Sequence, residues 1–137
     1  MQFLIATTLC WIVWSDLRTH RIPNRALILL LLSSLLAHAA SVDIAFNHLL
    51  VAATTFCIGI LLWRFCGLGM GDVKLISIMA LLLIPATLDS YLFFATIFSI
   101  SALIHLLAQA LILRSFSQPL PLAPSIVLAY IWLLYLK

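Results

Sequence analysis

The stretch Gly67-Leu68-Gly69-Met70-Gly71-Asp72-Val73-Lys74-Leu75 decides how the rest of the chain is organised. It contains three of the four glycines of the chain, together with one carboxylate and one amine, and apolar sequence flanks it on both sides. A charged side chain at the centre of a bilayer costs roughly 2.5 to 3.5 kcal/mol even on insertion scales. The sequence therefore predicts that Asp72 lies at a membrane–water boundary and is held there for chemistry.

The composition is that of a membrane protein. Of the 137 residues, 66% are hydrophobic and 8% are charged, and the mean hydropathy is +1.27. Soluble domains are nearer half apolar and about a quarter charged. We therefore expect an integral membrane protein with one domain over residues 1–137 and the lipid bilayer as its surroundings. The net charge of +3 is too thinly spread for a nucleic-acid surface, so no nucleic-acid partner is expected.

The cysteines and histidines show no pattern typical of a metal or cofactor site. No two cysteines form a CxxC pair, and no two histidines have the HExxH spacing. We interpret these side chains as packing or interfacial residues and expect neither a metal nor a cofactor. They are Cys10, Cys57, Cys66, His20, His38, His48 and His105.

Six apolar runs predict six helices. An open chain in lipid has to be helical, because unpaired strands would leave backbone groups without hydrogen bonds. A full crossing takes about 20 residues, so flanking residues must extend the shorter runs. We predict an all-α integral membrane bundle of six transmembrane helices. The runs are Met1–Ser15, Ala26–Ala40, Leu49–Trp63, Val73–Ile84, Tyr91–Leu113 and Ser125–Leu136.

Basic residues are concentrated in alternate loops of this predicted topology. The loops at 16–25, 64–74 and 114–124 carry six of the seven basic residues, and Lys137 is alone on the other side. By the positive-inside rule, these loops face the cytoplasm and both termini lie outside. The six residues are Arg18, Arg21, Arg25, Arg64, Lys74 and Arg114.

The same topology sorts the four carboxylates into two pairs. Asp16 follows the first run and Asp72 precedes the fourth, so both are expected on the cytoplasmic side, whereas Asp43 and Asp89 fall on the opposite side. The turn between the first two runs contains Pro23 and Asn24. We expect these two residues to set the angle of the second helix, with Asn24 as its N-cap.

Two carboxylates in a restricted site can divide the work of hydrolysis. One activates water as a base while the other donates a proton, because like charges at close range separate their pKa values. Gly69 and Gly71 would allow a peptide backbone to approach. Asp72 opens a helix and Asp16 closes one, so the helix dipoles favour Asp72 as the more acidic, resting base and Asp16 as the usual holder of the proton.

The residues alone leave other functions open. A small ion-coupled membrane carrier or channel could use the same Asp pair in a polar cavity. A structural membrane subunit of a secretion machine that has lost its activity would also fit the composition.

Two motifs together resemble those of a known family. Gly69 to Leu75 resembles the GxGDxKL signature of the type IV prepilin peptidases, GxGD membrane aspartyl proteases that cut leader peptides from pilin-like precursors. Asp16 to Asn24 resembles the family's other signature, an Asp followed shortly by Ile-Pro-Asn. Pro121-Leu122-Ala123-Pro124 is similar to the proline-rich segment before the family's last helix. The resemblance extends over essentially the whole chain.

The resemblance implies a function and a site. It implies that Asp16 and Asp72 are catalytic and open to the cytoplasm, in a multi-pass protein of the cytoplasmic (inner) membrane. The implied substrate is a pilin-like precursor with a short basic leader, cut just before an apolar helix. Residues expected to shape the site or contact this substrate are Gly69, Gly71, Lys74, Pro23 and Asn24.

Long members of the family carry a cytoplasmic extension with paired CxxC motifs, which is linked to methylation of the mature pilin. This chain resembles the short class that lacks the methyltransferase region and serves tight-adherence (Flp-type) pili. We therefore expect cleavage without N-methylation. Association into a homo-oligomer is left open.

Overall fold

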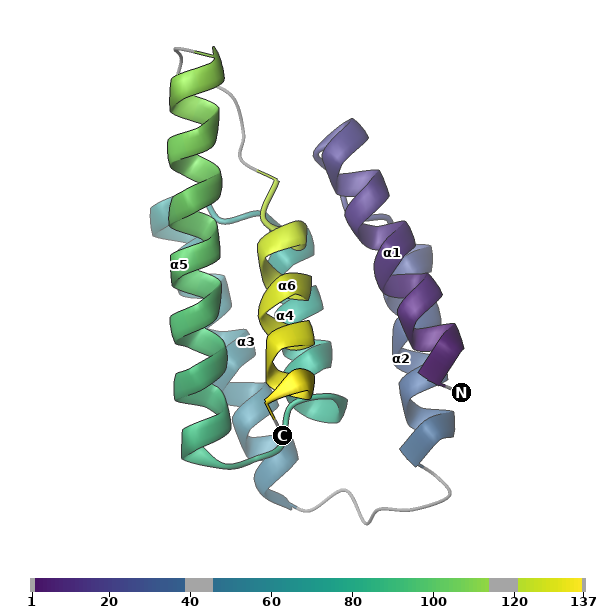
Figure 1. Ribbon diagram of the computed structural model, residues 1–137. Coiled ribbons are helices and arrows are strands. Elements are labelled where there is room, and N and C mark those ends of the chain that lie inside the picture. The colour runs from purple at the N-terminus through teal and green to yellow at the C-terminus, as the bar shows by residue number, and fades with distance from the viewer. Residues whose placement is uncertain (1, 39–45, 114–120, 137) are drawn as a thin grey trace.

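The computed structural model describes residues 2–38, 46–113 and 121–136, and its regular structure there is entirely helical (Figure 1). The prediction of an all-α chain with six helices is confirmed, and each helix matches one apolar run to within a few residues at either end. The helices are α1 (Gln2–Thr19), α2 (Asn24–His38), α3 (Phe46–Cys66), α4 (Met70–Leu82), α5 (Leu88–Leu113) and α6 (Ala123–Tyr135).

In the part of the chain that the structure describes, two helices are long and apolar enough to cross a membrane. These stretches are Phe46–Phe65 in α3 and Leu88–Leu111 in α5. Large apolar side chains such as Leu103, Leu107 and Leu111 are exposed on α5, which suits a surface facing lipid. α2 and α6 contain shorter apolar stretches. The described residues thus contain two candidate membrane spans, whereas six crossings and their orientation stay predictions.

The helices pack around a central pair, α4 and α6. α2 and α3 flank α4, while α1 and α5 flank α6, and α1 also packs against α2 (Figure 1). Among the described helices, α1 and α4 do not pack directly against one another. Each is therefore held in place by the two helices that both of them contact, α2 and α6.

The two chain ends lie at one end of the bundle (Figure 1). The C-terminal end of α1 and the N-terminal ends of α2, α4 and α6 lie at the other end. The described residues thus bring together four helix ends that are far apart in sequence. This arrangement agrees with the predicted path of the chain.

The core is formed mainly by α1, α2, α4 and α6, with Phe94 from α5. Ile12, Leu30, Leu75 and Ile126, one from each of these helices, have no exposed surface. Helices in lipid associate through close packing rather than through a hydrophobic driving force, so small residues at their contacts matter. Gly59 of α3 is such a residue: a Cβ there would lie 2.5 Å from Cγ1 of Val73.

The turn between α1 and α2 is closed by local hydrogen bonds. Ser15 Oγ donates to the carbonyl of Arg21 at 3.1 Å, and His20 adopts a φ of 51°. The carbonyl of Pro23 accepts the N–H groups of Ala26 and Leu27, which starts α2. α2 begins at Asn24, so the expected N-cap is wrong: Pro23 occupies that position, and the Asn24 side chain is directed to α4 instead.

Candidate active site

Asp16 and Asp72 lie at the same end of the bundle. Asp16 is in the last turn of α1 and Asp72 is the third residue of α4, and these two helix ends lie at the same end of the bundle (Figure 1). Both carboxylates are buried, with exposed fractions of 5% and 8%. Asp16 directly follows the apolar run that ends at Ser15, and Asp72 directly precedes the apolar run that begins at Val73. The structure thus places both acidic residues at the same end of the bundle, as their spacing predicts.

The environment of Asp72 favours its protonated form. Its Oδ1 is buried and has no hydrogen-bond partner within the described ranges. Burial raises the pKa of Asp72 to about 7, with a further upward contribution from the charge of Asp16 and an opposing one from the backbone N–H of Gly69. The contribution from Asp16 indicates that the two carboxyl groups are near enough for the charge of one to affect the other.

The glycines next to Asp72 make room for neighbours within the protein. Gly69 is the N-cap of α4, and a Cβ there would lie 2.6 Å from Oδ2 of Asp72, because the carboxylate folds back over the start of its own helix. A Cβ at Gly71 would lie 3.0 Å from that of Ile22, in the turn before α2. Both glycines therefore shape the site, and approach of a substrate backbone to them stays a prediction.

The environment of Asp16 offers more support for a negative charge. Its Oδ2 accepts a hydrogen bond of 3.0 Å from the backbone N–H of Ala123, the first residue of α6. Burial raises the pKa of Asp16, and the opposing contributions come from the Ala123 hydrogen bond, then from His20 and His105. The N-terminus of α6, with its partial positive charge, thus faces this carboxylate.

These environments favour the opposite order of acidity of the two aspartates from the one that the helix dipoles predict. The helix dipoles predicted Asp72 as the more acidic residue, because only the end of each aspartate's own helix was considered. In the structure, Asp16 receives a donor from a third helix, whereas one oxygen of Asp72 has none. These contacts favour Asp72 as the carboxyl group that keeps a proton and Asp16 as the one that is ionised.

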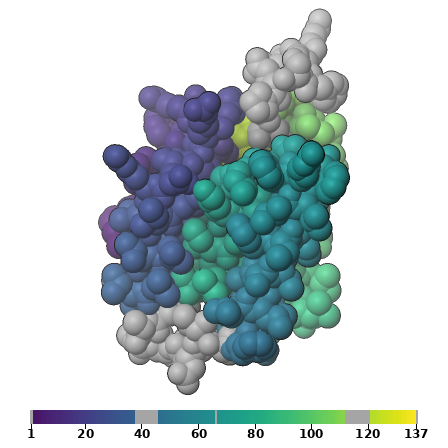
Figure 2. Space-filling view, turned by 180° about the vertical axis from the view of Figure 1, so that it is seen from behind, coloured from purple at the N-terminus to yellow at the C-terminus, as the bar shows by residue number. Residues whose placement is uncertain are grey.

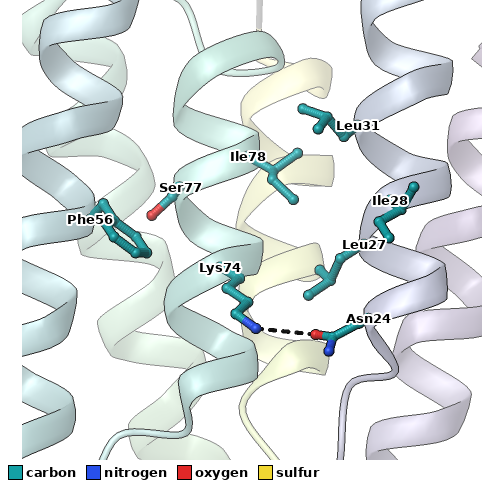
Figure 3. Close-up of a pocket in the computed structure, with 8 residues that line it drawn as sticks. All are labelled: Asn24, Leu27, Ile28, Leu31, Phe56, Lys74, Ser77 and Ile78. Carbon is teal, nitrogen blue, oxygen red and sulfur yellow. Dashed lines mark hydrogen bonds between the residues drawn. The ribbon is translucent and has the colours of Figure 1, made fainter.

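Lys74 and Asn24 connect α4 to α2 at this end of the bundle. Lys74 Nζ donates to Oδ1 of Asn24 at 3.2 Å (Figure 3). Since Lys74 follows Asp72 by two residues, about 200° of helix rotation, it projects from the opposite face of α4. The pair therefore fixes the position of α4 relative to α2, while Pro23 stands at the start of α2.

A groove with a volume of about 410 Å³ continues from this pair along the outer face of α4. Its polar residues Asn24 and Lys74 lie at one end, and apolar side chains follow (Figure 3). Figure 2 shows this face, with α4 recessed between α2 and α3. The remaining lining residues are Leu27, Ile28, Leu31, Phe56, Ser77 and Ile78.

Sequence reasoning missed the contribution of α6 to the site. The donor to Asp16 is a backbone N–H, which has no side-chain signature. The available signal was Pro124 at the start of α6, because proline in the first helical turn marks a helix N-terminus with free N–H groups. His105 and Ser125, interpreted only as packing or apolar-run residues, also lie near this helix start.

Comparison with known proteins gives one match. A family model described as the type IV leader peptidase family matches residues 3–108, which include both Asp16 and Asp72 and end within α5. The search of curated proteins gave no significant match. The search of solved structures gave none either.

Proposed function

Because the chain belongs to the type IV leader peptidase family, which comprises aspartic prepilin peptidases, we propose that Asp16 and Asp72 are its catalytic residues. The observation that carries this proposal is the burial of two electrostatically interacting carboxyl groups at one end of the bundle. They are in the part of the chain that the family match covers. The proposed reaction is hydrolysis of the peptide bond between a leader and a pilin-like sequence.

The different environments of the two aspartates assign their roles. Asp16 accepts a backbone hydrogen bond and stays ionised, so it acts as the general base. Asp72, with a buried Oδ1 that lacks a donor in the described residues, keeps the shared proton and acts as the general acid. The pair titrates as a unit, because each charge affects the other.

Hydrolysis then proceeds in two balanced steps. In the first, Asp16 takes a proton from water, the water oxygen bonds to the scissile carbonyl carbon, and Asp72 gives its proton to the carbonyl oxygen. In the second, the C–N bond breaks, the leaving nitrogen takes the proton from Asp16, and Asp72 regains a proton from the diol. The products are a new carboxyl group and a new amine, and both aspartates return to their starting states.

The position of the pair suits a substrate that is itself held in the membrane. In the predicted topology, the four helix ends around the pair face the cytoplasm, in the inner membrane. The apolar helix of a precursor would lie in lipid while its basic leader stays in water. The scissile bond between them would then lie at the membrane surface, at the level of the two carboxylates.

The test is cleavage of a synthetic precursor by the purified protein in proteoliposomes. The precursor carries a short basic leader followed by an apolar helix. We expect Asp16→Asn and Asp72→Asn each to reduce kcat by roughly 10³-fold or more, because each removes one half of a unit that acts together. Asp89→Asn is the matched control, since this exposed aspartate lies in the first turn of α5 and should not affect cleavage.

The proposal fails if both Asn variants still cleave the precursor at the rate of the unmodified protein. It also fails if Asp89→Asn is as inactive as the other two while all three remain folded. Uptake of ions into the vesicles without any cleavage would favour the carrier instead.

A further inference from the structure

His105 is an ionisable residue in a helix that is otherwise suited to lipid. It lies within the apolar stretch Leu88–Leu111 of α5, and it is the only residue of α5 after Tyr91 that can carry a charge. Ionisable side chains inside membrane helices are costly and are usually retained for a function. The position of His105 therefore requires an explanation beyond filling space.

The contacts of His105 lead to Asp16. Its half-buried ring places Nδ1 3.4 Å from Oγ of Ser125, a buried residue in the first turn of α6. Two residues earlier in that turn, Ala123 donates its N–H to Asp16. Ser101, one helical turn before His105, donates to the carbonyl of Ser125 at 3.3 Å. One turn of α6 is thus held by α5 on one side and bound to Asp16 on the other.

The packing of the helices connects α5 to the site through the first turn of α6. Among the described helices, α5 packs mainly against α6, and Tyr91 near its start also donates a hydrogen bond of 2.8 Å to the carbonyl of Ala80 in α4. The ionisable residues of α6 are Tyr130 and Tyr135, which follow Ser125 by more than a helical turn. The facing carboxylate on which the charge of His105 acts is Asp16 of α1.

We propose that His105 is a positioning residue for Asp16. Through Ser125 it fixes the first turn of α6, which carries the Ala123 donor, and in its protonated form it favours the ionised state of Asp16. The inference rests on the proposed role of Asp16 as the general base. It adds a third ionisable group, outside the two aspartates, to the control of the reaction.

The proposal has a defined effect on pH dependence. A positive charge near a carboxylate lowers the pKa of that carboxylate, so removing the charge raises it. The acidic limb of the kcat profile, which follows ionisation of Asp16, should then move to higher pH. His20 also affects the charge of Asp16, and Asp16 in turn affects Asp72. Both His20 and Asp72 are therefore kept unchanged when the His105 variants are compared with the unmodified protein.

Two substitutions separate the charge from the hydrogen bond. His105→Gln can still bond Ser125 but cannot become charged, so we expect its acidic limb to move upward by about one pH unit with much of the maximal kcat retained. His105→Leu removes both properties and should also lower kcat by about tenfold or more, since small displacements of catalytic groups are costly. KM should change little in both variants.

The control and a second readout keep the test decisive. Ser99→Ala removes an exposed hydroxyl six residues earlier on α5 and should leave the profile unchanged. Isotope-edited infrared titration of the Asp16 carboxyl, without any substrate, should show the same upward shift in His105→Gln. Ser125→Ala, which keeps the charge of His105, should lower kcat without that shift.

The inference is overturned if His105→Gln leaves both the acidic limb and the Asp16 titration where they are in the unmodified protein. It is also overturned if His105→Leu loses activity only in proportion to a loss of folded protein. Complete lack of cleavage by the unmodified protein would instead contradict the proposed function, while the infrared titration would still decide the role of His105.

Discussion

Asp16 and Ala123 lie 107 positions apart in sequence and are joined by a hydrogen bond of 3.0 Å between Oδ2 and the backbone N–H. The bond connects the end of α1 to the start of α6, two helices that flank the site. A backbone donor at a helix N-terminus is aimed by the whole helix, so it stabilises charge without any side chain. This contact is the structural reason for assigning the ionised state to Asp16.

The first prediction removes this donor alone. Replacing Ala123 by lactic acid turns its amide into an ester and deletes the N–H with little change in shape. A hydrogen bond to a charged group contributes about 1.5 to 3 kcal/mol, so we expect kcat to fall by about tenfold or more and the Asp16 pKa to rise. The same ester exchange at Val127, further along α6, is the control. Equal kcat losses at both positions would contradict the specific role of Ala123.

The second prediction concerns the pH dependence of kcat. Asp16 has to be ionised and Asp72 protonated, so the profile should be bell-shaped. Because the pKa of Asp72 is raised to about 7, activity should fall as the pH rises through that value, when the general acid loses its proton. Activity should also fall on the acidic side as Asp16 becomes protonated. A rate that stays constant from pH 6 to well above pH 8 would be inconsistent with this assignment.

The third prediction compares two glycines of the same loop. Gly69 has an ordinary φ of −65°, but its Cβ would collide with the Asp72 carboxylate. Gly67 has open space but a φ of 73°. Gly69→Ala should therefore lower kcat and displace the Asp72 titration, whereas Gly67→Ala should cost about 1 kcal/mol of stability with kcat retained. Thermal unfolding and kcat are measured on both variants. A loss of kcat in Gly67→Ala with kcat retained in Gly69→Ala would contradict the prediction.

Much of this fold could be predicted from the sequence, because apolar runs separated by turn residues leave an open chain in lipid little choice but helices. The common location of Asp16 and Asp72 followed from counting the helices between them. The donor at Ala123 could not be predicted, because a backbone N–H carries no residue signature. The order of protonation expected from the dipoles stays a prediction, and burial together with the contact from a third helix favours the opposite order.

The fourth prediction concerns packing behind the site. A Cβ at Gly59 would lie 2.5 Å from Cγ1 of Val73, the neighbour of Asp72 on α4. Gly59→Ala should therefore separate α3 from α4 and destabilise the protein by about 1 to 3 kcal/mol, the usual cost of overpacking. Val73→Ala should relieve part of that loss in the double variant, as a double-mutant cycle of thermal unfolding would show. Strict additivity of the two effects would exclude the contact.

The proposed function depends on the electrostatic interaction between Asp16 and Asp72, and a single titration can test that interaction. The four acidic residues of the chain are all aspartates, so Asp72 is the one acidic side chain left once Asp16, Asp43 and Asp89 are changed to Asn. Infrared spectroscopy in proteoliposomes reports the pKa of this isolated Asp72, and the Asp43→Asn, Asp89→Asn background, which keeps Asp16 as well, reports the two titrations of the pair for comparison. The account predicts a lower Asp72 pKa when Asp16 is replaced, because a neighbouring negative charge has been removed. An unchanged or higher pKa would contradict it.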